Sequence, residues 1–125
     1  MTIVDENCLE ELAVYLGDQL HEVLEKYISD GDAYVARLRD SLLAGDFKGL
    51  ADIAHPLKST SQQIGAGSVA AIAREIEVNA RRENDLDYAE LIDRLPEQFE
   101  QVERFLRDYM ARQGTASTSA SWPGS

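Results

Sequence analysis

Cysteine and histidine are scarce in this chain of 125 residues, which contains one cysteine and two histidines. Cys8 alone cannot form an internal disulfide, and this suits a reducing compartment, so we expect a cytoplasmic protein. The three side chains are widely spaced in the sequence, which argues against a structural zinc site. We therefore expect neither a bound metal nor another cofactor.

Basic residues are in deficit as well, because 12 Lys and Arg stand against 23 Asp and Glu, for a net charge of −11. Nucleic-acid backbones and anionic lipids both recruit basic surfaces, so we expect no contact with either. No apolar run approaches the length of a membrane-spanning helix. The first residues, MTIVDENCLEELAV, lack the basic start and apolar block of a secretory signal. A soluble protein that works with proteins or small molecules is the remaining expectation.

Apolar residues recur at helical spacing, and no segment shows the period-2 alternation of a strand. This pattern predicts helices at about residues 5–16, 18–44, 46–64 and 68–82, and a last one from 85 or 87 to 112. Asp18, Asp46 and Asp87 are the expected N-caps of the second, third and fifth helices. Gly65 opens a Gly-Ala-Gly string that predicts the end of the third helix.

Three residues within these helices are unfavourable to helical structure. Gly31 interrupts the second helix, and Pro96 lies inside the fifth. Pro56 removes a backbone N–H in the third helix, but the apolar phase continues through Leu57 and Ile64. We therefore expect one helix across Pro56, with a local kink.

Short connections between long amphipathic helices favour antiparallel neighbours. We expect an all-α fold, an up-and-down antiparallel four-helix bundle with the short first helix packed on one end. Residues 1–112 are expected to form this single domain. Residues 113–125 lack charge and periodicity and are expected to be a flexible tail, a linker or an expression remnant.

His55 lies opposite the apolar face of the third predicted helix, roughly 130° from its centre at about 100° per residue. Lys58 and Ser59 follow at i+3 and i+4, and Gln62 at i+7, so all three lie beside His55 on one surface. A solvated imidazole, with an unperturbed pKa of about 6.5, is mostly neutral at pH 7 and can attack a phosphoryl group. A lysine one turn away can pair with the phosphoryl oxygens.

One motif connects these residues with a known family. The string Ala54-His55-Pro56-Leu57-Lys58-Ser59, then Gly65-Ala66 and later Ile76-Glu77, resembles the signature of histidine-containing phosphotransfer (HPt) domains. The family pattern is H-x-L-K-G/S, then G-A, then a helix that ends in L-E. The turns Leu16-Gly17-Asp18 and Ala44-Gly45-Asp46-Phe47 also resemble family turns. The resemblance covers about residues 4–110.

The resemblance implies a phosphocarrier without kinase activity of its own, which relays phosphoryl groups between receiver-domain aspartates in a two-component phosphorelay. By position, His55 is the phospho-acceptor and Lys58 the cation that pairs with phosphoryl oxygens. Ser59 gives the partner access, and Glu77 hydrogen-bonds or orients the histidine. Gln62, which lies beside His55 by helical spacing, is expected to support the site. The implied partners are receiver domains of response regulators and a hybrid sensor histidine kinase. We expect this chain to be a monomer. Ser59 stands where glycine is commonest, which leaves partner choice open.

Several of these residues also have simpler explanations. Glu77 is equally well explained as a helix-surface carboxylate. His21 has no comparable neighbours, and we expect it to be structural or idle. Arg74, Arg81 and Arg82 are either solvated charges or contacts to an acidic receiver surface.

Three other functions are considered. A helical adaptor that binds a partner without phosphate needs neither His55 nor Lys58. A hydrolase with His55 as general base is disfavoured, because the motif holds no carboxylate to orient the imidazole, no neighbouring nucleophile and no evident cleft. An autonomous kinase is rejected, because the chain has no glycine-rich nucleotide loop.

Overall fold

The structure, a computed structural model, describes residues 3–120, with side chains as far as residue 113. Its helices are α1 (Glu6–Leu16), α2 (Leu20–Leu43), α3 (Phe47–Ile64), α4 (Gly67–Arg81) and α5 (Tyr88–Ala120). One 3₁₀ turn, η1 (Gly17–Gln19), joins α1 to α2. No strand occurs within residues 3–120, and the predicted all-α class is confirmed.

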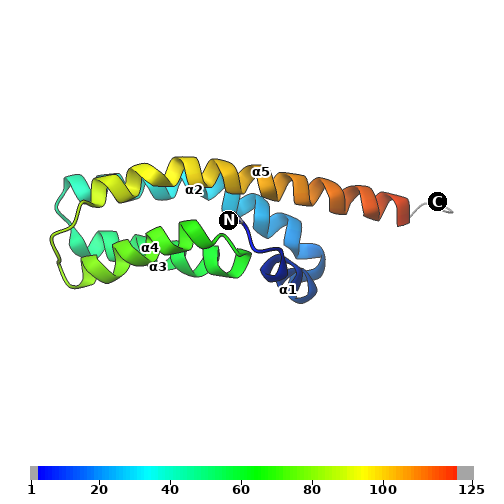
Figure 1. Cartoon of the computed structure of the whole chain (residues 1–125), viewed down its shortest axis with the longest axis horizontal. Helices are drawn as coiled ribbons and strands as arrows, with labels where there is room; N and C mark the ends of the chain where they lie inside the picture. Colours follow the sequence, from blue (N-terminus) through cyan, green and yellow to red (C-terminus); the bar gives the residue numbers. More distant parts are fainter. Residues whose placement is uncertain (1–2, 121–125) are drawn as a thin grey trace.

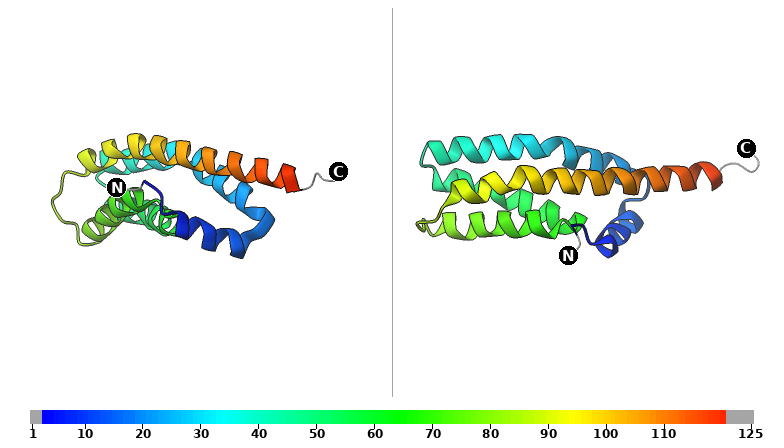
Figure 2. Two further views of the ribbon diagram at one scale, coloured as in Figure 1. Left: turned by 45° about the vertical axis from the view of Figure 1, so that its right-hand side comes forward. Right: turned by 45° about the horizontal axis from the view of Figure 1, so that its top comes forward.

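The helices α2 to α5 form the predicted up-and-down bundle (Figure 1). Each helix packs against the next one in the chain, and α2 against α5 closes the bundle. Two further views show that α2 and α5 project beyond the shorter α3 and α4 (Figure 2). The short helix α1 lies at that end of the bundle and contacts α3 and α2. The extra N-terminal helix is therefore where the sequence analysis expected it.

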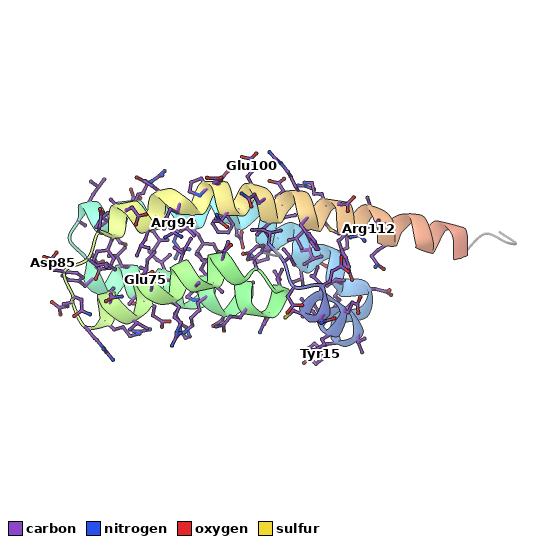
Figure 3. The ribbon with its side chains drawn as sticks, viewed as in Figure 1. Tyr15, Glu75, Asp85, Arg94, Glu100 and Arg112 are labelled. Atoms are coloured by element: carbon purple, nitrogen blue, oxygen red, sulfur yellow. The ribbon has the colours of Figure 1, made fainter. Side chains whose placement is uncertain are left out.

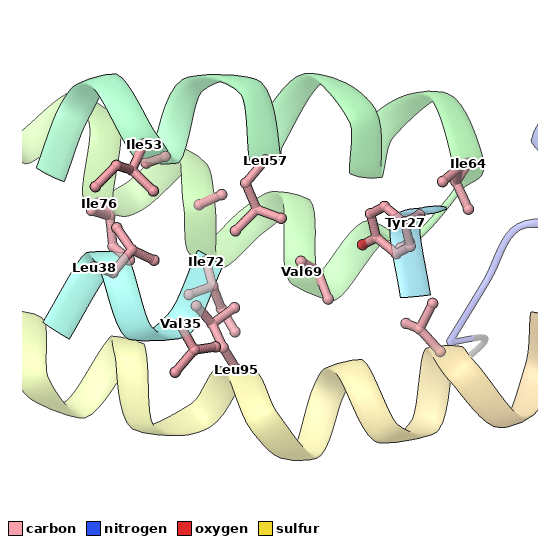
Figure 4. Packing of buried hydrophobic residues seen from close by; sticks show 14 of the residues in the cluster. Tyr27, Val35, Leu38, Ile53, Leu57, Ile64, Val69, Ile72, Ile76 and Leu95 are labelled. Atoms are coloured by element: carbon pink, nitrogen blue, oxygen red, sulfur yellow. The ribbon is translucent and has the colours of Figure 1, made fainter. Parts of the chain in front are cut away.

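The apolar stripes of the helices meet in one interior. Ile53 and Leu57 point inward from α3 (Figure 4), and Leu57 is completely buried. One polar pair lies within this core, where the Tyr27 and Ser61 hydroxyls are 2.8 Å apart and satisfy each other. The other large side chains that are fully buried are Val4, Leu9, Leu24, Leu38, Leu50, Ile64, Val69, Ile76, Ile92, Leu95 and Leu106.

The aspartate caps predicted for two helices are present. Asp46 accepts a hydrogen bond from the Gly49 N–H at 2.8 Å, and Asp87 accepts one from the Glu90 N–H at 3.1 Å. The cap predicted at Asp18 is wrong, because the 3₁₀ turn occupies that position and α2 begins without a side-chain cap.

The fourth helix also begins differently from the prediction. α4 starts at Gly67, one residue before Ser68, and no side chain caps it. The Ser68 hydroxyl instead donates to Gln98 of α5 at 2.6 Å. This hydroxyl therefore makes a tertiary contact between α4 and α5.

Gly65 ends α3, as predicted, and also receives the N-terminal segment. Its φ of +92° lies in the left-handed region that glycine tolerates. The Asp5 N–H donates to its carbonyl at 2.9 Å. A Cβ at residue 65 would lie 2.7 Å from the Asp5 carbonyl oxygen, so this junction has no room for a side chain.

The residues unfavourable to helices are accommodated within continuous ones. α3 runs through Pro56 and α5 through Pro96, and the kink expected at Pro56 stays a prediction. Gly31 is buried in α2, and a Cβ there would lie 3.2 Å from the Phe99 ring. The absence of a side chain at Gly31 therefore allows α5 to approach α2 closely.

α5 continues to Ala120, past the expected domain boundary at residue 112. Extending an existing helix needs no new nucleus, so residues of modest helix propensity can follow. The boundary itself and the flexible tail stay predictions. Trp122 lies outside the described residues.

Candidate functional site

His55 projects from the outer surface of α3, as its helical phase predicts. Its side chain is 55 % exposed, whereas Ala54 and Leu57 on the inner face are completely buried. The bundle thus fixes the backbone of this residue on one side and leaves its imidazole accessible on the other.

Glu77 of α4 reaches the imidazole across the α3–α4 interface. Its Oε2 lies 2.7 Å from Nδ1 of His55. The Glu77 side chain is only 6 % exposed, so this carboxylate is not an ordinary surface charge. The structure therefore brings together His55 and Glu77, and the simpler explanation of Glu77 as a helix-surface carboxylate is wrong.

Two cations share the same carboxylate, one on each side. Lys58 Nζ donates to Oε1 of Glu77 at 2.6 Å. Arg81 donates to Oε2 from Nη2 at 2.9 Å and from Nε at 3.2 Å. The oxygen that contacts the imidazole is therefore also the one that Arg81 holds.

These contacts determine the charge of Glu77. Burial alone would raise the pKa of its carboxyl group, but the hydrogen bonds from Lys58, Arg81 and His55 outweigh burial and lower the pKa to about 2. Glu77 is consequently ionised at neutral pH. A buried charge of this kind is tolerated because its acceptor sites are occupied by donors.

An ionised carboxylate can only accept hydrogen bonds, and this fixes the tautomer of the neutral imidazole. Nδ1 of His55 must carry the proton that it donates to Glu77. Nε2 then keeps its lone pair, on a ring more than half exposed. Among the described side chains, no serine, threonine or cysteine hydrogen-bonds to Nε2. The arrangement can present a nucleophilic nitrogen to a reagent that arrives from outside.

The surroundings of Lys58 differ from those expected of a solvated charge. Its side chain is only 22 % exposed, and its ammonium is paired with Glu77. An ammonium group has three N–H donors, so this pairing leaves two for another acceptor.

Ser59 is half-buried and Gln62 is exposed, and both are on α3. No hydrogen bond between described side chains joins either residue to His55. Gln62 instead lines a surface cavity together with Cys8 and Tyr15 at the α1 end of the bundle. Figure 3 shows Tyr15 pointing outward from α1. The supporting roles of Ser59 and Gln62 stay predictions.

The sequence analysis did not single out Arg81 as a site residue, although it lies one helical turn after Glu77. A spacing of four residues between an acid and a base on a helix is the local signal that points to this pair. The second histidine, His21, is paired only with Glu25, at 3.6 Å, and lies outside this cluster.

The described part of the chain holds neither a group of metal-binding side chains nor a helix that could span a membrane. No three His, Cys, Asp or Glu side chains come close enough there to hold a metal ion. None of the helices within residues 3–120 has both the length and the apolar character needed to cross a lipid bilayer.

Comparisons with known proteins find similar sequences and a similar structure. Two relatives, both named phosphorelay protein LuxU, come from two different strains of Vibrio vulnificus. Each is 29% identical to this chain over 100 residues, which is 76% of this chain and 87% of the relative. The crystal structure of histidine-containing phosphotransfer protein B from Pseudomonas aeruginosa superposes with a TM-score of 0.81 at 26% identity, covering 88% of this chain and 96% of that one.

The family comparison covers more than half of the chain. Residues 22–105 match the model of the Hpt domain. This range contains α3 and α4 completely, and with them the histidine, the lysine and the buried glutamate of the site. The chain therefore belongs to the Hpt domain family and is a histidine phosphotransfer protein.

Proposed function

We propose that His55 accepts a phosphoryl group from an aspartyl phosphate on one receiver domain and passes it to the aspartate of another. The observation that carries this proposal is the contact between an exposed imidazole and an ionised, buried Glu77. It supports Nε2 as the nucleophilic atom because Nδ1 is occupied as a donor.

The proposed reaction needs no proton from a third group. The Nε2 lone pair attacks phosphorus, an N–P bond forms, and the P–O bond to the aspartate breaks so that aspartate leaves as a carboxylate. The ring keeps its Nδ1 proton and becomes positively charged. Glu77, which hydrogen-bonds to that proton, stabilises the charge. The next receiver aspartate reverses these steps.

Lys58 is proposed as the cation for the phosphoryl oxygens. In phosphoryl transfer the transition state spreads negative charge over those oxygens, so an adjacent ammonium helps in both directions. The two N–H donors that Glu77 does not use are available for this contact. Before the phosphoryl group arrives, the pairing with Glu77 keeps the ammonium one helical turn from the imidazole.

The expected partners are receiver domains of response regulators and of a hybrid sensor histidine kinase. The chain is proposed to act as a phosphocarrier without kinase activity of its own, in the cytoplasm and as a monomer. The relatives support a role in a phosphorelay, and the partners belong to the proposal.

A hydrolase is less well supported, although one reason for rejecting it was wrong. The motif around His55 holds no carboxylate to orient the imidazole, but Glu77 of α4 supplies one from outside the motif. Within the described residues, no nucleophilic side chain hydrogen-bonds to Nε2 of His55. This still disfavours a hydrolase mechanism. The alternative of a non-phosphorylated adaptor is decided by the labelling experiment that follows.

The decisive test is transfer from a labelled, phosphorylated receiver domain to the chain. We expect label on the wild type and none on His55→Gln, with circular dichroism to confirm that the variant is folded. The labelled product should be acid-labile and base-stable, as a phosphoramidate is. His21→Gln is the matched control and should be labelled like the wild type. Label on His55→Gln, or no label on the wild type, would reject the proposal.

A further inference from the structure

The two oxygens of Glu77 have different partners. Oε1 accepts only from Lys58, whereas Oε2 accepts from both His55 and Arg81. Arg81 therefore holds the one oxygen on which the imidazole depends. Lys58 holds the other oxygen, which the imidazole does not contact.

The two cations also differ in how firmly they are held. Arg81 has two N–H groups on one oxygen, and it lies one turn after Glu77 on the same helix, so the pair is set within α4 alone. Lys58 reaches Glu77 from another helix through a flexible chain and a single contact. Of the two, Lys58 has fewer hydrogen bonds to Glu77 to break.

A lysine that serves the phosphoryl oxygens must divide its donors between them and Glu77. If Lys58 were the only cation on Glu77, its departure would leave a buried carboxylate with the imidazole alone. Such a poorly compensated charge is costly, and the carboxylate would turn toward solvent or toward the ammonium. With Arg81 in place, Oε2 stays compensated when Lys58 leaves Oε1.

We infer that Arg81 is a positioning residue for phosphotransfer: it anchors Glu77 Oε2, so that Lys58 can leave Oε1 for the phosphoryl group without Glu77 releasing the imidazole. This inference rests on the proposed function of His55. Arg81 needs no contact with the phosphoryl group in this role and acts through Glu77.

The rate test uses single-turnover transfer at saturating phosphorylated receiver, which separates transfer from docking. Arg81→Ala should slow transfer about ten- to hundredfold, because a misplaced nucleophile loses most of its orientation. Arg81→Lys keeps the charge but not the two-point contact, and should recover part of the rate. The control is Arg82→Ala, which removes an exposed charge from the next position and should stay within about twofold of the wild type. Equal rates for Arg81→Ala and Arg82→Ala would overturn the inference.

A double-mutant cycle separates this role from direct contact with the phosphate or the partner. If Arg81 acts through Glu77, then Arg81→Ala should cause no further loss in a Glu77→Ala protein. The full tenfold or greater loss in that background would show that Arg81 touches something else, and would overturn the inference. Neither result affects the labelling of His55, so a failure here is distinguishable from a failure of the proposed function.

A spectroscopic test is independent of activity. In ¹⁵N spectra recorded at alkaline pH, the wild-type His55 ring should carry its proton on Nδ1 almost exclusively. Arg81→Ala should show a mixture with the Nε2–H form, and Arg82→Ala should not. The charged groups at this ring are Glu77, which contacts it, and Lys58 and Arg81, which contact Glu77. Asp52 on α3 interacts with the charge of Arg81. Arg81→Ala leaves Lys58, Asp52 and Glu77 in place. If Arg81→Ala does not fold, Arg81→Lys is measured in its place. An unchanged transfer rate and an unchanged His55 tautomer in Arg81→Lys would then overturn the inference.

Discussion

Nδ1 of His55 and Oε2 of Glu77 lie 2.7 Å apart, although the two residues are 22 positions apart in the sequence. The contact exists only because α3 and α4 are antiparallel neighbours in one register. A slip of one helical turn between them would move Glu77 away from the imidazole by about 5 Å. The imidazole is thus oriented by the fold as well as by its own helix.

The low pKa of Glu77 predicts a pH-dependent contribution to stability. The pKa is about 2 in the folded protein, against an ordinary value of 4.5. A carboxyl whose pKa is lowered by folding stabilises the native state above its unfolded pKa, and this stabilisation is lost as pH falls through the folded value. We expect a contribution of a few kcal/mol that is complete above pH 4.5 and lost progressively toward pH 2.

Urea unfolding at a series of pH values checks this expectation. The free energy of unfolding of wild type should fall more steeply below about pH 4.5 than that of Glu77→Gln, which cannot ionise there. Glu75→Gln, an exposed carboxylate on the same helix, is the control and should follow the wild type. Parallel curves for the wild type and Glu77→Gln would contradict the ionised, paired state of Glu77.

Lys58→Ala should slow transfer without unfolding the bundle. An ammonium at a docked, water-poor interface is worth roughly 1–3 kcal/mol to the transition state, or about ten- to hundredfold in rate. Lys58→Arg should recover part of the loss, because charge is kept while reach and geometry change. The control is Lys48→Ala on the same helix, where the lysine is paired with Asp52 instead. Wild-type single-turnover rates in folded Lys58→Ala would show that this lysine serves Glu77 alone.

Stability should separate the two faces of α3. Leu57→Ala removes a fully buried side chain and should cost roughly 2–5 kcal/mol of unfolding free energy. His55→Gln changes a side chain that is 55 % exposed and should cost about 1 kcal/mol or less, the value of one hydrogen bond. Chemical denaturation of both variants measures the difference. Similar losses would mean that His55 contributes to the core.

Gly65→Ala should destabilise the protein more than Gly45→Ala. Both glycines have positive φ, so each substitution carries the cost of a left-handed residue, about 1–2 kcal/mol. At Gly45 a Cβ would meet nothing within 4 Å, whereas at Gly65 it would lie 2.7 Å from a backbone oxygen of Asp5. In chemical denaturation, the free energy of unfolding of Gly65→Ala should be lower than that of Gly45→Ala by about 1 kcal/mol or more. Equal losses of unfolding free energy would mean that the N-terminal segment shifts to accommodate the new Cβ without destabilising the protein.

Much of the fold could be predicted from the sequence because its determinants are local. Apolar spacing indicates which face of α3 is buried, and hence that His55 is exposed. Asp46 and Asp87 cap their helices through neighbours three residues away. The cap predicted at Asp18 failed because a 3₁₀ turn occupies that position. Contacts between distant helices, such as that of Ser68 with α5, were not predicted.

The site was predicted less completely than the fold for the same reason. The family resemblance identified His55, Lys58 and Glu77, but the resting partner of Lys58 was not foreseen. That contact joins α3 to α4 and depends on their register. The contact of Arg81 with the same Glu77 oxygen that His55 uses could also be recognised only from the register of α3 and α4. The spacing of Arg81 from Glu77 was nevertheless visible in the sequence.

The way α1 is attached has a consequence for local opening. Leu9 is its only buried residue, whereas α3 buries residues along its whole length. Elements with little buried area unfold locally at a smaller free energy than the whole protein. Backbone amides of α1 should therefore exchange with deuterium through detachment of this helix alone, while those around Leu57 should exchange only when the whole bundle unfolds. We therefore expect the N-terminal helix and the helix that carries His55 to unfold as different cooperative units of one small protein.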